Sequence, residues 1–254
     1  MKRLTKKSIR LIMGLLVLIA TMGNHTAIAD AGVDHGIFGE LLKKYIVNGG
    51  VDYRGFKSEE KRLDAYLRQL ETVQVDSLGR NEQFAFYTNS YNAWTIKLIL
   101  GGYPGVKSIK DLGSLFKSPW KKKFVKINGE TLTLDDIEHN ILRPQFKDPR
   151  VHFAINCASK SCPPLAASPY TGGTLDAQLD AATIAFINDP GKNRLEGSVL
   201  YVSKIFNWFS GDFNDDVLSF FLKYSDRTLK ADLTRKGDDI TIQYLDYDWS
   251  LNGS

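Results

Sequence analysis

The amino-acid sequence predicts an α+β fold: a single compact domain with a mixed or antiparallel sheet and several packed helices. Of the 254 residues, 43% are hydrophobic and 24% are charged, an ordinary globular composition that excludes a disordered or collagen-like chain. Helix and strand patterns alternate irregularly, without the repeating strand–helix–strand order that a parallel sheet requires. Neither an internal repeat nor a low-complexity linker divides the chain. One domain is therefore expected.

Two helices are expected in the first half of the chain. In residues 59–71, leucine and tyrosine side chains recur at the three- and four-residue spacing of one helix face. A longer helix is expected over residues 81–100, with an aromatic face and a stop at Gly101.

A β-hairpin is expected at residues 124–134, because two strand-like runs flank an Asn-Gly pair that begins at Asn128. Thr133 and Asp136 have the spacing of a capping box, which predicts a short helix from Asp135 to about Leu142.

The second half mixes helices and strands. The mostly apolar run at residues 151–155 predicts a buried central strand. Further helices are expected at 175–187 and 215–224, and further strands at 200–202 and 240–244.

Residues 1–29 have the three parts of an export signal: a basic start, an apolar run and the small-residue pattern that ends at Ala29. Cleavage near Ala29 leaves a globular domain over residues 30–254, which we expect to be periplasmic or secreted. The alternative is an uncleaved anchor, but the apolar run is shorter than the ~20 residues of a spanning helix. No stable membrane insertion is expected after cleavage.

Charge and motifs narrow the possible partners. Removing the five positive charges of residues 1–29 from a formal charge of +4 leaves −1, which gives no reason to expect nucleic-acid binding. The cysteines and histidines lack the spacing of zinc ligands. There is no phosphate-binding glycine loop. No metal and no cofactor are predicted, and the expected partner is a small molecule or a peptide.

The two cysteines carry the main chemical signal. In an oxidising compartment, Cys157 and Cys162 predict a disulfide, provided that the chain turns between them. The alternative is a Cys157 thiolate nucleophile activated by a histidine. The candidate bases are His152, which lies five residues earlier and would face away on a strand, and His139, which adjoins Glu138.

Polar residues on the long helix form a second candidate patch. Asn89 and Asn92 lie three residues apart and therefore share one helix face. Asparagine is a mediocre helix former, so the pair predicts fixed partners, either neighbouring loops or a ligand. Near the chain end, Trp249 is expected to be buried and Asp248 hydrogen-bonded, which would dock this stretch onto the body of the domain.

Four separated segments, residues 81–93, 136–139, 150–164 and 247–252, resemble the domain-of-unknown-function family numbered 547. The resemblance spans about 78–252, in the family's order. It implies a single domain and an exported bacterial protein, and it implies no activity, because the family is named for lacking one.

The chain also has a more distant similarity to papain-like and transglutaminase-like cysteine hydrolases, but it departs from their pattern at the cysteine. Those folds place the cysteine at a helix start, where the helix dipole favours a thiolate. Here Cys157 follows an expected strand, and prolines follow Cys162.

Two functional hypotheses follow. The first is a ligand-binding or envelope-associated domain with a Cys157–Cys162 disulfide, in which Asn89, Asn92 and Asn156 are candidate ligand contacts. The second is a cysteine-dependent hydrolase or acyl transferase of the cell envelope. In that hypothesis Cys157 is the nucleophile, His139 or His152 is the base, Glu138 orients the base and Asn156 donates to an oxyanion. Under either hypothesis, a cleft is expected around Glu138, His139, His152 and Cys157.

Overall fold

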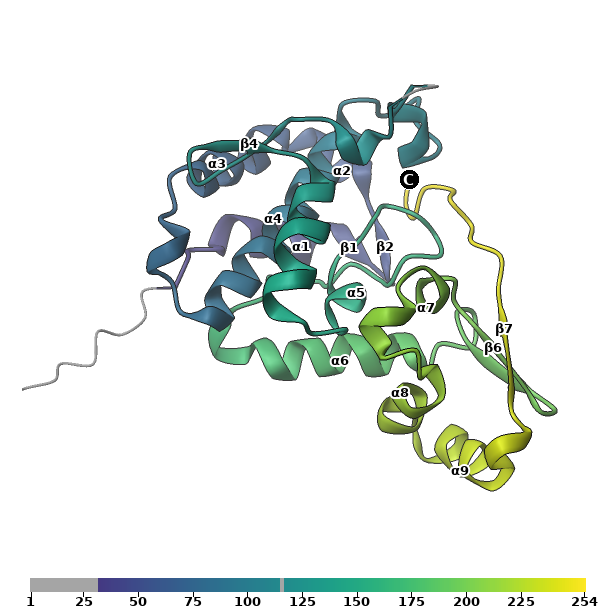
Figure 1. Ribbon diagram of the computed structural model, residues 1–254. Coiled ribbons are helices and arrows are strands. Elements are labelled where there is room, and N and C mark those ends of the chain that lie inside the picture. Colours follow the sequence, from purple (N-terminus) through teal and green to yellow (C-terminus); the bar gives the residue numbers. More distant parts are fainter. Residues whose placement is uncertain (1–31, 115–116) are drawn as a thin grey trace, which may run out of the picture.

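A long helix, α4 (Arg80–Leu100), runs through the N-terminal half of the molecule, and shorter helices pack around it (Figure 1). The computed structural model describes residues 32–114 and 117–254. It has several packed helices and three small sheets of two or three strands, which confirms the α+β fold class. The expected export signal at 1–29 lies outside the described residues.

The N-terminal helices follow the apolar periodicity of the sequence. Helix α4 matches the expected long helix within one residue, and α3 (Glu60–Glu71) matches the expected helix at 59–71. Two further helices, α1 (Gly36–Tyr45) and α2 (Tyr53–Ser58), flank a two-stranded sheet of β1 (Ile46–Val47) and β2 (Gly50–Val51). The side chains of Leu63, Tyr66, Leu67 and Leu70 are buried, as their spacing on α3 predicts.

The predicted hairpin is present as β3 (Val125–Ile127) and β4 (Glu130–Leu132), which pair antiparallel. Asn128 and Gly129 have positive φ angles of 49° and 73°, as a tight two-residue turn requires. After the hairpin, η4 (Asp136–Phe146) is a π-helix and extends beyond the expected end at Leu142. At its start the Thr133 hydroxyl accepts from the Asp136 amide, and Asp136 accepts from the Thr133 amide, so the predicted capping box is confirmed.

Residues 151–155 correct one expectation. They are buried, but they form a short helix, α5 (Val151–Ala154), and not a central strand. The turn is fixed before it starts, because Asp148 accepts from the Arg150 amide with its side chain and from the Val151 amide with its carbonyl. A short apolar run shows burial but does not distinguish a strand from a buried helical segment.

The C-terminal part contains two of the expected helices and a three-stranded sheet. The expected helices are present as α6 (Leu175–Ile187) and α8 (Val217–Tyr224). Strands β5 (Arg194–Glu196), β6 (Val199–Val202) and β7 (Thr241–Tyr244) form one sheet in that order, antiparallel and then parallel. The short helices are α7 (Ile205–Trp208), α9 (Arg227–Lys236), η1 (Val75–Ser77), η2 (Ile109–Leu112), η3 (Pro119–Lys121), η5 (Gly172–Thr174), η6 (Ser210–Phe213) and η7 (Gly237–Asp239).

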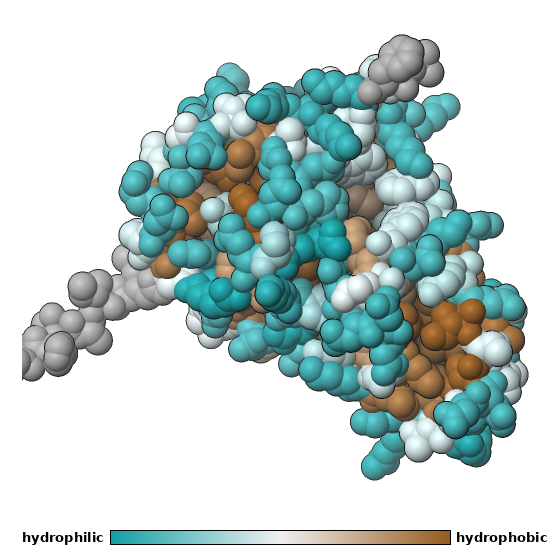
Figure 2. Space-filling model, in the orientation of Figure 1, coloured by the Kyte–Doolittle hydropathy of each residue, from teal (hydrophilic) through white to brown (hydrophobic). Residues whose placement is uncertain are grey.

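The buried side chains form two hydrophobic clusters. The N-terminal core surrounds α4, whereas the C-terminal core joins α6, α7, α8 and the three-stranded sheet. Figure 2 shows hydrophobic residues reaching the surface over α7 and α8. No helix within residues 32–114 and 117–254 has the length and apolar character needed to span a bilayer.

The segment after β7 crosses back to the N-terminal half (Figure 1). Leu251 pairs with Ser159, and Gly253 pairs with Val51. The Asp248 carboxylate accepts from the Ser250 amide and hydroxyl, as expected of a docked segment. Trp249 packs against the N-terminal core but is only partly buried, in contrast to the expected burial, because it also lines an open cleft.

Candidate functional site

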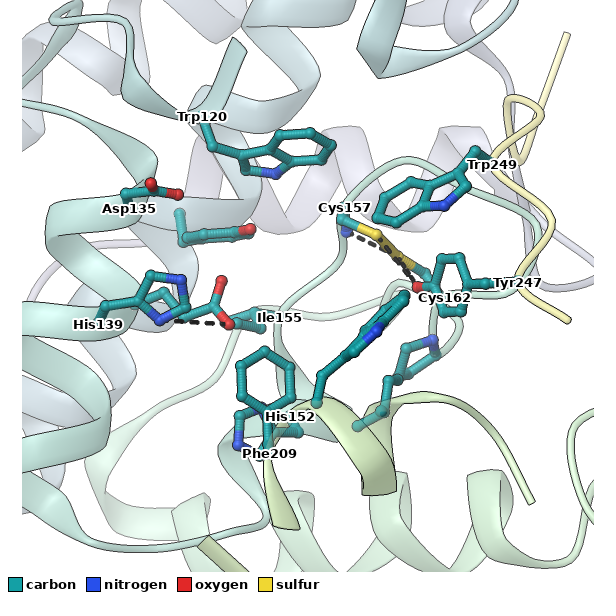
Figure 3. Close-up of a pocket in the computed structure, with 15 residues that line it drawn as sticks. Trp120, Asp135, His139, His152, Ile155, Cys157, Cys162, Phe209, Tyr247 and Trp249 are labelled. Atoms are coloured by element: carbon teal, nitrogen blue, oxygen red, sulfur yellow. Dashed lines mark hydrogen bonds and ion pairs between the residues drawn. A yellow bond between two sulfur atoms is a disulfide. The ribbon is translucent and has the colours of Figure 1, made fainter. Parts of the chain in front are cut away.

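A cleft of about 180 Å³ lies where the two cores and the final segment meet. Figure 3 shows Asp135 and His139 on one side, the cysteine pair with Tyr247 and Trp249 opposite them, and His152 with Phe209 along a third side. The side chains of Asp135 and His139 therefore face Tyr247 and Trp249 across the cleft.

Aromatic rings form most of the wall. Six of the lining residues are aromatic: Tyr91, Trp120, Trp208, Phe209, Tyr247 and Trp249. The rings of Trp208 and Trp249 are stacked at 5.8 Å, and Tyr247 lies 4.6 Å from Trp249. Trp208 is 44% exposed although it is large and apolar, so part of this wall remains open to solvent.

A disulfide closes one end of the cleft. Cys157 and Cys162 are bonded, with their Cα atoms 6.2 Å apart, which confirms the expected pair. The turn between them includes Ala158 at a φ of 60°. The Tyr247 hydroxyl lies 3.4 Å from the sulfur of Cys157 and 3.3 Å from that of Cys162. The final segment also bonds this loop, because Lys160 donates its amide to the Ser250 carbonyl.

Glu138 is a buried acid in the cleft wall. Burial raises its pKa to about 7, although the Arg143 charge and a hydrogen bond with Tyr91 act in the opposite direction. Near neutral pH this carboxyl therefore exchanges between its acid and its carboxylate form. A group poised in this way is a functional-site candidate because small changes in its surroundings shift its charge.

His139 adjoins Glu138 but is more exposed. Its Nδ1 lies 3.2 Å from an Arg143 nitrogen and 3.9 Å from the Glu138 carboxylate. Because Arg143 can only donate, Nδ1 is the acceptor and the proton is on Nε2. Burial lowers the pKa of His139, so its neutral form dominates at neutral pH.

His152 is buried and held by a second carboxylate. Its Nε2 lies 2.7 Å from Asp212, which also accepts from the Arg143 Nε at 2.6 Å. Its ring stacks on Phe209 with the centroids 4.1 Å apart. Burial lowers the pKa of His152, so its neutral Nε2–H donates to Asp212. The Asp212 pKa is lowered by the donors His152 and Arg143.

The structure brings Glu138, His139, His152 and Cys157 to the same cleft. It does not pair the cysteine with a histidine within the described part of the chain. The Cys157 sulfur contacts the hydroxyls of Ser159 and Tyr247.

The three asparagines lie behind the cleft and hold loops together. Asn92 donates to the Ala154 carbonyl and accepts from the Asn156 amide. Asn89 both donates to and accepts from the backbone of Tyr170. The Asn156 side chain donates to the Pro163 carbonyl and accepts from the Ala158 amide, which fixes the cysteine loop.

Sequence reasoning missed Asp212, Arg143 and the aromatic wall. Asp212 lies 60 residues from His152 in the chain, so no local sequence spacing predicts their contact. Three of the four tryptophans, Trp120, Trp208 and Trp249, line the cleft, but a tryptophan in a sequence is as consistent with a core as with a cleft. Among the residues that the structure describes, no group of three or more His, Cys, Asp or Glu side chains is placed to hold a metal ion.

One comparison with known proteins yields a match. Residues 75–187 match a family model described as a protein of unknown function, DUF547. The resemblance to DUF547 is confirmed over residues 75–187, and the segment at 247–252 lies outside the match. The matched DUF547 segment supplies α4, η4, the cysteine loop and α6, whereas Trp208, Phe209, Tyr247 and Trp249 lie beyond it. Neither a curated protein nor a solved structure matches the chain.

Proposed function

We propose that the protein is an exported binding domain that holds a small molecule or a peptide side chain in the aromatic cleft. The observation that carries this proposal is the composition of the wall: six aromatic rings around a few ionisable groups, with Trp208 44% exposed at the rim. Ligand sites are concave and mostly apolar, with a small number of placed polar groups. Trp208 is not an isolated exposed ring, because it packs against Tyr247 and Trp249, and a contiguous apolar surface is typical of a ligand-binding groove.

The hydrogen bonds of the cleft support binding over nucleophilic catalysis. The Cys157 sulfur is bonded in the disulfide. His152 is hydrogen-bonded to Asp212, and His139 is hydrogen-bonded to Arg143. A thiolate enzyme needs a free sulfur within hydrogen-bonding reach of its base. The asparagines expected as ligand contacts have backbone partners instead and support the shape of the cleft.

The disulfide also supports export. Disulfides persist in oxidising compartments, and an export signal at residues 1–29 would direct the chain to such a compartment. The protein is recovered from the culture medium or the periplasm and alkylated without reductant, and its intact mass is measured. This mass tests both the cleavage near Ala29 and the disulfide. We expect an N-terminus near Asp30 and no alkyl group on either cysteine. The full-length mass, or two added alkyl groups, would contradict the proposal.

Binding is tested with the tryptophan at the rim. A panel of small amines, sugars, aromatic acids and short peptides is titrated while tryptophan fluorescence is recorded. We expect saturable binding for at least one class, lost in Trp208→Ala and retained in Tyr244→Ala. Tyr244 is a matched control because it is 41% exposed and lies outside the cleft. A panel without any saturable, Trp208-dependent ligand would contradict the binding proposal.

A cysteine-dependent hydrolase or acyl transferase remains the second candidate, because Cys157, His139 and His152 share one cleft. It requires reduction of the disulfide. Hydrolysis of ester or peptide substrates that appears only after reduction, and disappears in Cys157→Ser, would favour this candidate over a binding domain.

A further inference from the structure

The ligand class of the cleft follows from its charge. The lining residues include the carboxyls of Asp135 and Glu138, and among these described lining residues there is no lysine or arginine. The two lining histidines have lowered pKa values and are neutral at neutral pH. The lining groups therefore carry only negative charge, beside the negative faces of aromatic rings.

Aromatic faces in this region already bind cations of the chain itself. The Lys110 ammonium lies 3.9 Å from the Trp249 ring centroid, and the Arg143 guanidinium lies 4.7 Å from that of Phe209. A cation within about 6 Å of a ring centroid is attracted by the ring quadrupole, most strongly by tryptophan. Two of the rings that line the cleft, those of Trp249 and Phe209, thus each already attract a cation of the chain itself.

The Glu138 carboxyl provides a counter-ion at the inner end. Its side chain is 11% exposed, so an occupant of the cleft can reach it while excluding most of its water. The ionisable groups that act on it are Tyr91 of α4, Asp135, Arg143 of η4, and Asp212 of η6. His139 lies 3.9 Å away, and Tyr247 acts from the final segment. Arg143 is the one cation in this set, and it is bonded bidentately to Asp212.

We propose that the cleft binds a small organic cation, with an ammonium or quaternary ammonium group held between the aromatic rings and the carboxylates of Asp135 and Glu138. This inference rests on the proposed function and names its ligand class. A neutral apolar ligand would satisfy the rings but would desolvate both carboxyls without a partner, which is unfavourable. An anion would face both carboxyls and is excluded on charge.

The test compares ligands of equal shape and different charge. Choline and its neutral carbon isostere, 3,3-dimethylbutan-1-ol, are titrated into the disulfide-bonded protein at pH 8 by calorimetry. We expect choline to bind at least tenfold more tightly, since a desolvated cation–π contact contributes about that factor. A second pair of ligands, Nα-acetyl-lysine methylamide and its uncharged norleucine analogue, is titrated in the same way. Preference for lysine in this pair identifies a peptide side chain as the source of the cation.

Variants separate charge from shape. Glu138→Gln should weaken choline binding about tenfold and leave the neutral alcohol unchanged, whereas Tyr244→Ala should change neither. Because Glu138 has a pKa of about 7, choline affinity should fall as the pH is lowered from 8 to 6, and this dependence should disappear in Glu138→Gln. Retained pH dependence in the variant would overturn the assignment to Glu138.

The outcomes distinguish this inference from the proposed function. Equal affinity for the charged and neutral member of both pairs would overturn the cation inference while leaving a binding domain. The same holds if neither pair binds but the sugars or the aromatic acids of the panel show Trp208-dependent binding. If nothing in the panel or the two pairs binds, the cation inference and the binding domain both fail.

Discussion

The N-terminal and C-terminal cores bury their side chains in different ways. Around α4, polar side chains are buried among the apolar ones, and Asn89, Asn92 and His35 each have defined hydrogen-bond partners. The C-terminal part also buries a hydrogen-bonded Asn193, but its core consists mainly of phenylalanine rings. Phe206, for example, has ring neighbours in Phe153, Phe213, Phe220 and Phe221. Directional bonds fix where loops lie, whereas ring packing contributes stability with less positional constraint.

The cleft lies between these regions and combines both kinds of contact. Its ionisable side belongs to elements of the N-terminal core, and Trp208 and Phe209 come from the C-terminal part. Because the C-terminal core consists mainly of packed rings, substitutions in it should mainly lower the free energy of unfolding. Damage to the polar bonds near α4 should also change the shape of the cleft.

The largest effect is expected for Phe206→Ala. Phe206 is fully buried, so the substitution leaves a cavity and should lower the free energy of unfolding by about 3–5 kcal/mol. Chemical denaturation at constant pH measures it. Asn207→Ala, one residue away on an exposed position, is the control and should stay within about 0.5 kcal/mol of the wild type. A loss below about 1 kcal/mol for Phe206→Ala would show that the ring cluster is not a packed core.

A pH-dependent effect of about 3 kcal/mol is expected for His35. Burial lowers its pKa from 6.5 to about 4, and its Nε2 already accepts a hydrogen bond from Asn89. The unfolded chain therefore binds more protons between these values, so the free energy of unfolding falls as the pH drops from 6.5 to 4. Denaturation of wild type and His35→Gln across this window should give a shallower pH slope for the variant.

Glu138 supplies a control of opposite sign for the same experiment. Its pKa is raised from 4.5 to about 7, so the folded protein binds the extra proton. Its contribution is complete below pH 4.5 and is lost as the pH rises through 7. Glu138→Gln should therefore gain stability relative to wild type at pH 8. Unchanged pH slopes in both variants would show that neither group is perturbed by burial.

The smallest of these effects, about 2–3 kcal/mol, is expected for Asn92→Ala. The substitution leaves the Ala154 carbonyl and the Asn156 amide without their partner in a buried place. Ligand binding should weaken with it, because Asn156 fixes the cysteine loop at the cleft. Denaturation and the choline titration check both effects. Asn140→Ala, at an exposed position on η4, removes only an exposed hydrogen bond to Asp136, so it should cost less than about 1 kcal/mol and leave the affinity unchanged. Equal effects of the two substitutions would contradict the loop-holding role.

Local signals in the sequence predicted the elements that local physics determines. The Asn128-Gly129 turn, the Thr133–Asp136 capping box and the periodicity of α3 depend on residues close together in the chain. The apolar run at residues 151–155 predicts a strand, but the segment forms helix α5. Four residues are too few to form a helix alone, so its turn depends on Asp148 and on burial.

The candidate site was predictable only in part. Glu138, His139, His152 and Cys157 were placed together because they fall in two short segments rich in chemical groups. The orientation of His152 depends on Asp212, which lies on a separate element. The aromatic wall is assembled from distant segments, and an indole in a sequence is as consistent with a core as with a cleft.

The residues that line the cleft are synthesised at different times, because they lie far apart in the sequence. Tyr247 and Trp249 form one wall, yet they follow the cysteine loop by about ninety residues, and Tyr247 contacts both of its sulfurs. A growing chain can form α4, η4 and the disulfide while this wall is still missing. The cleft is thus complete only after residues 247–249 have been synthesised. A chain cut before residue 247 would keep four of the six lining rings and would lack Tyr247 and Trp249.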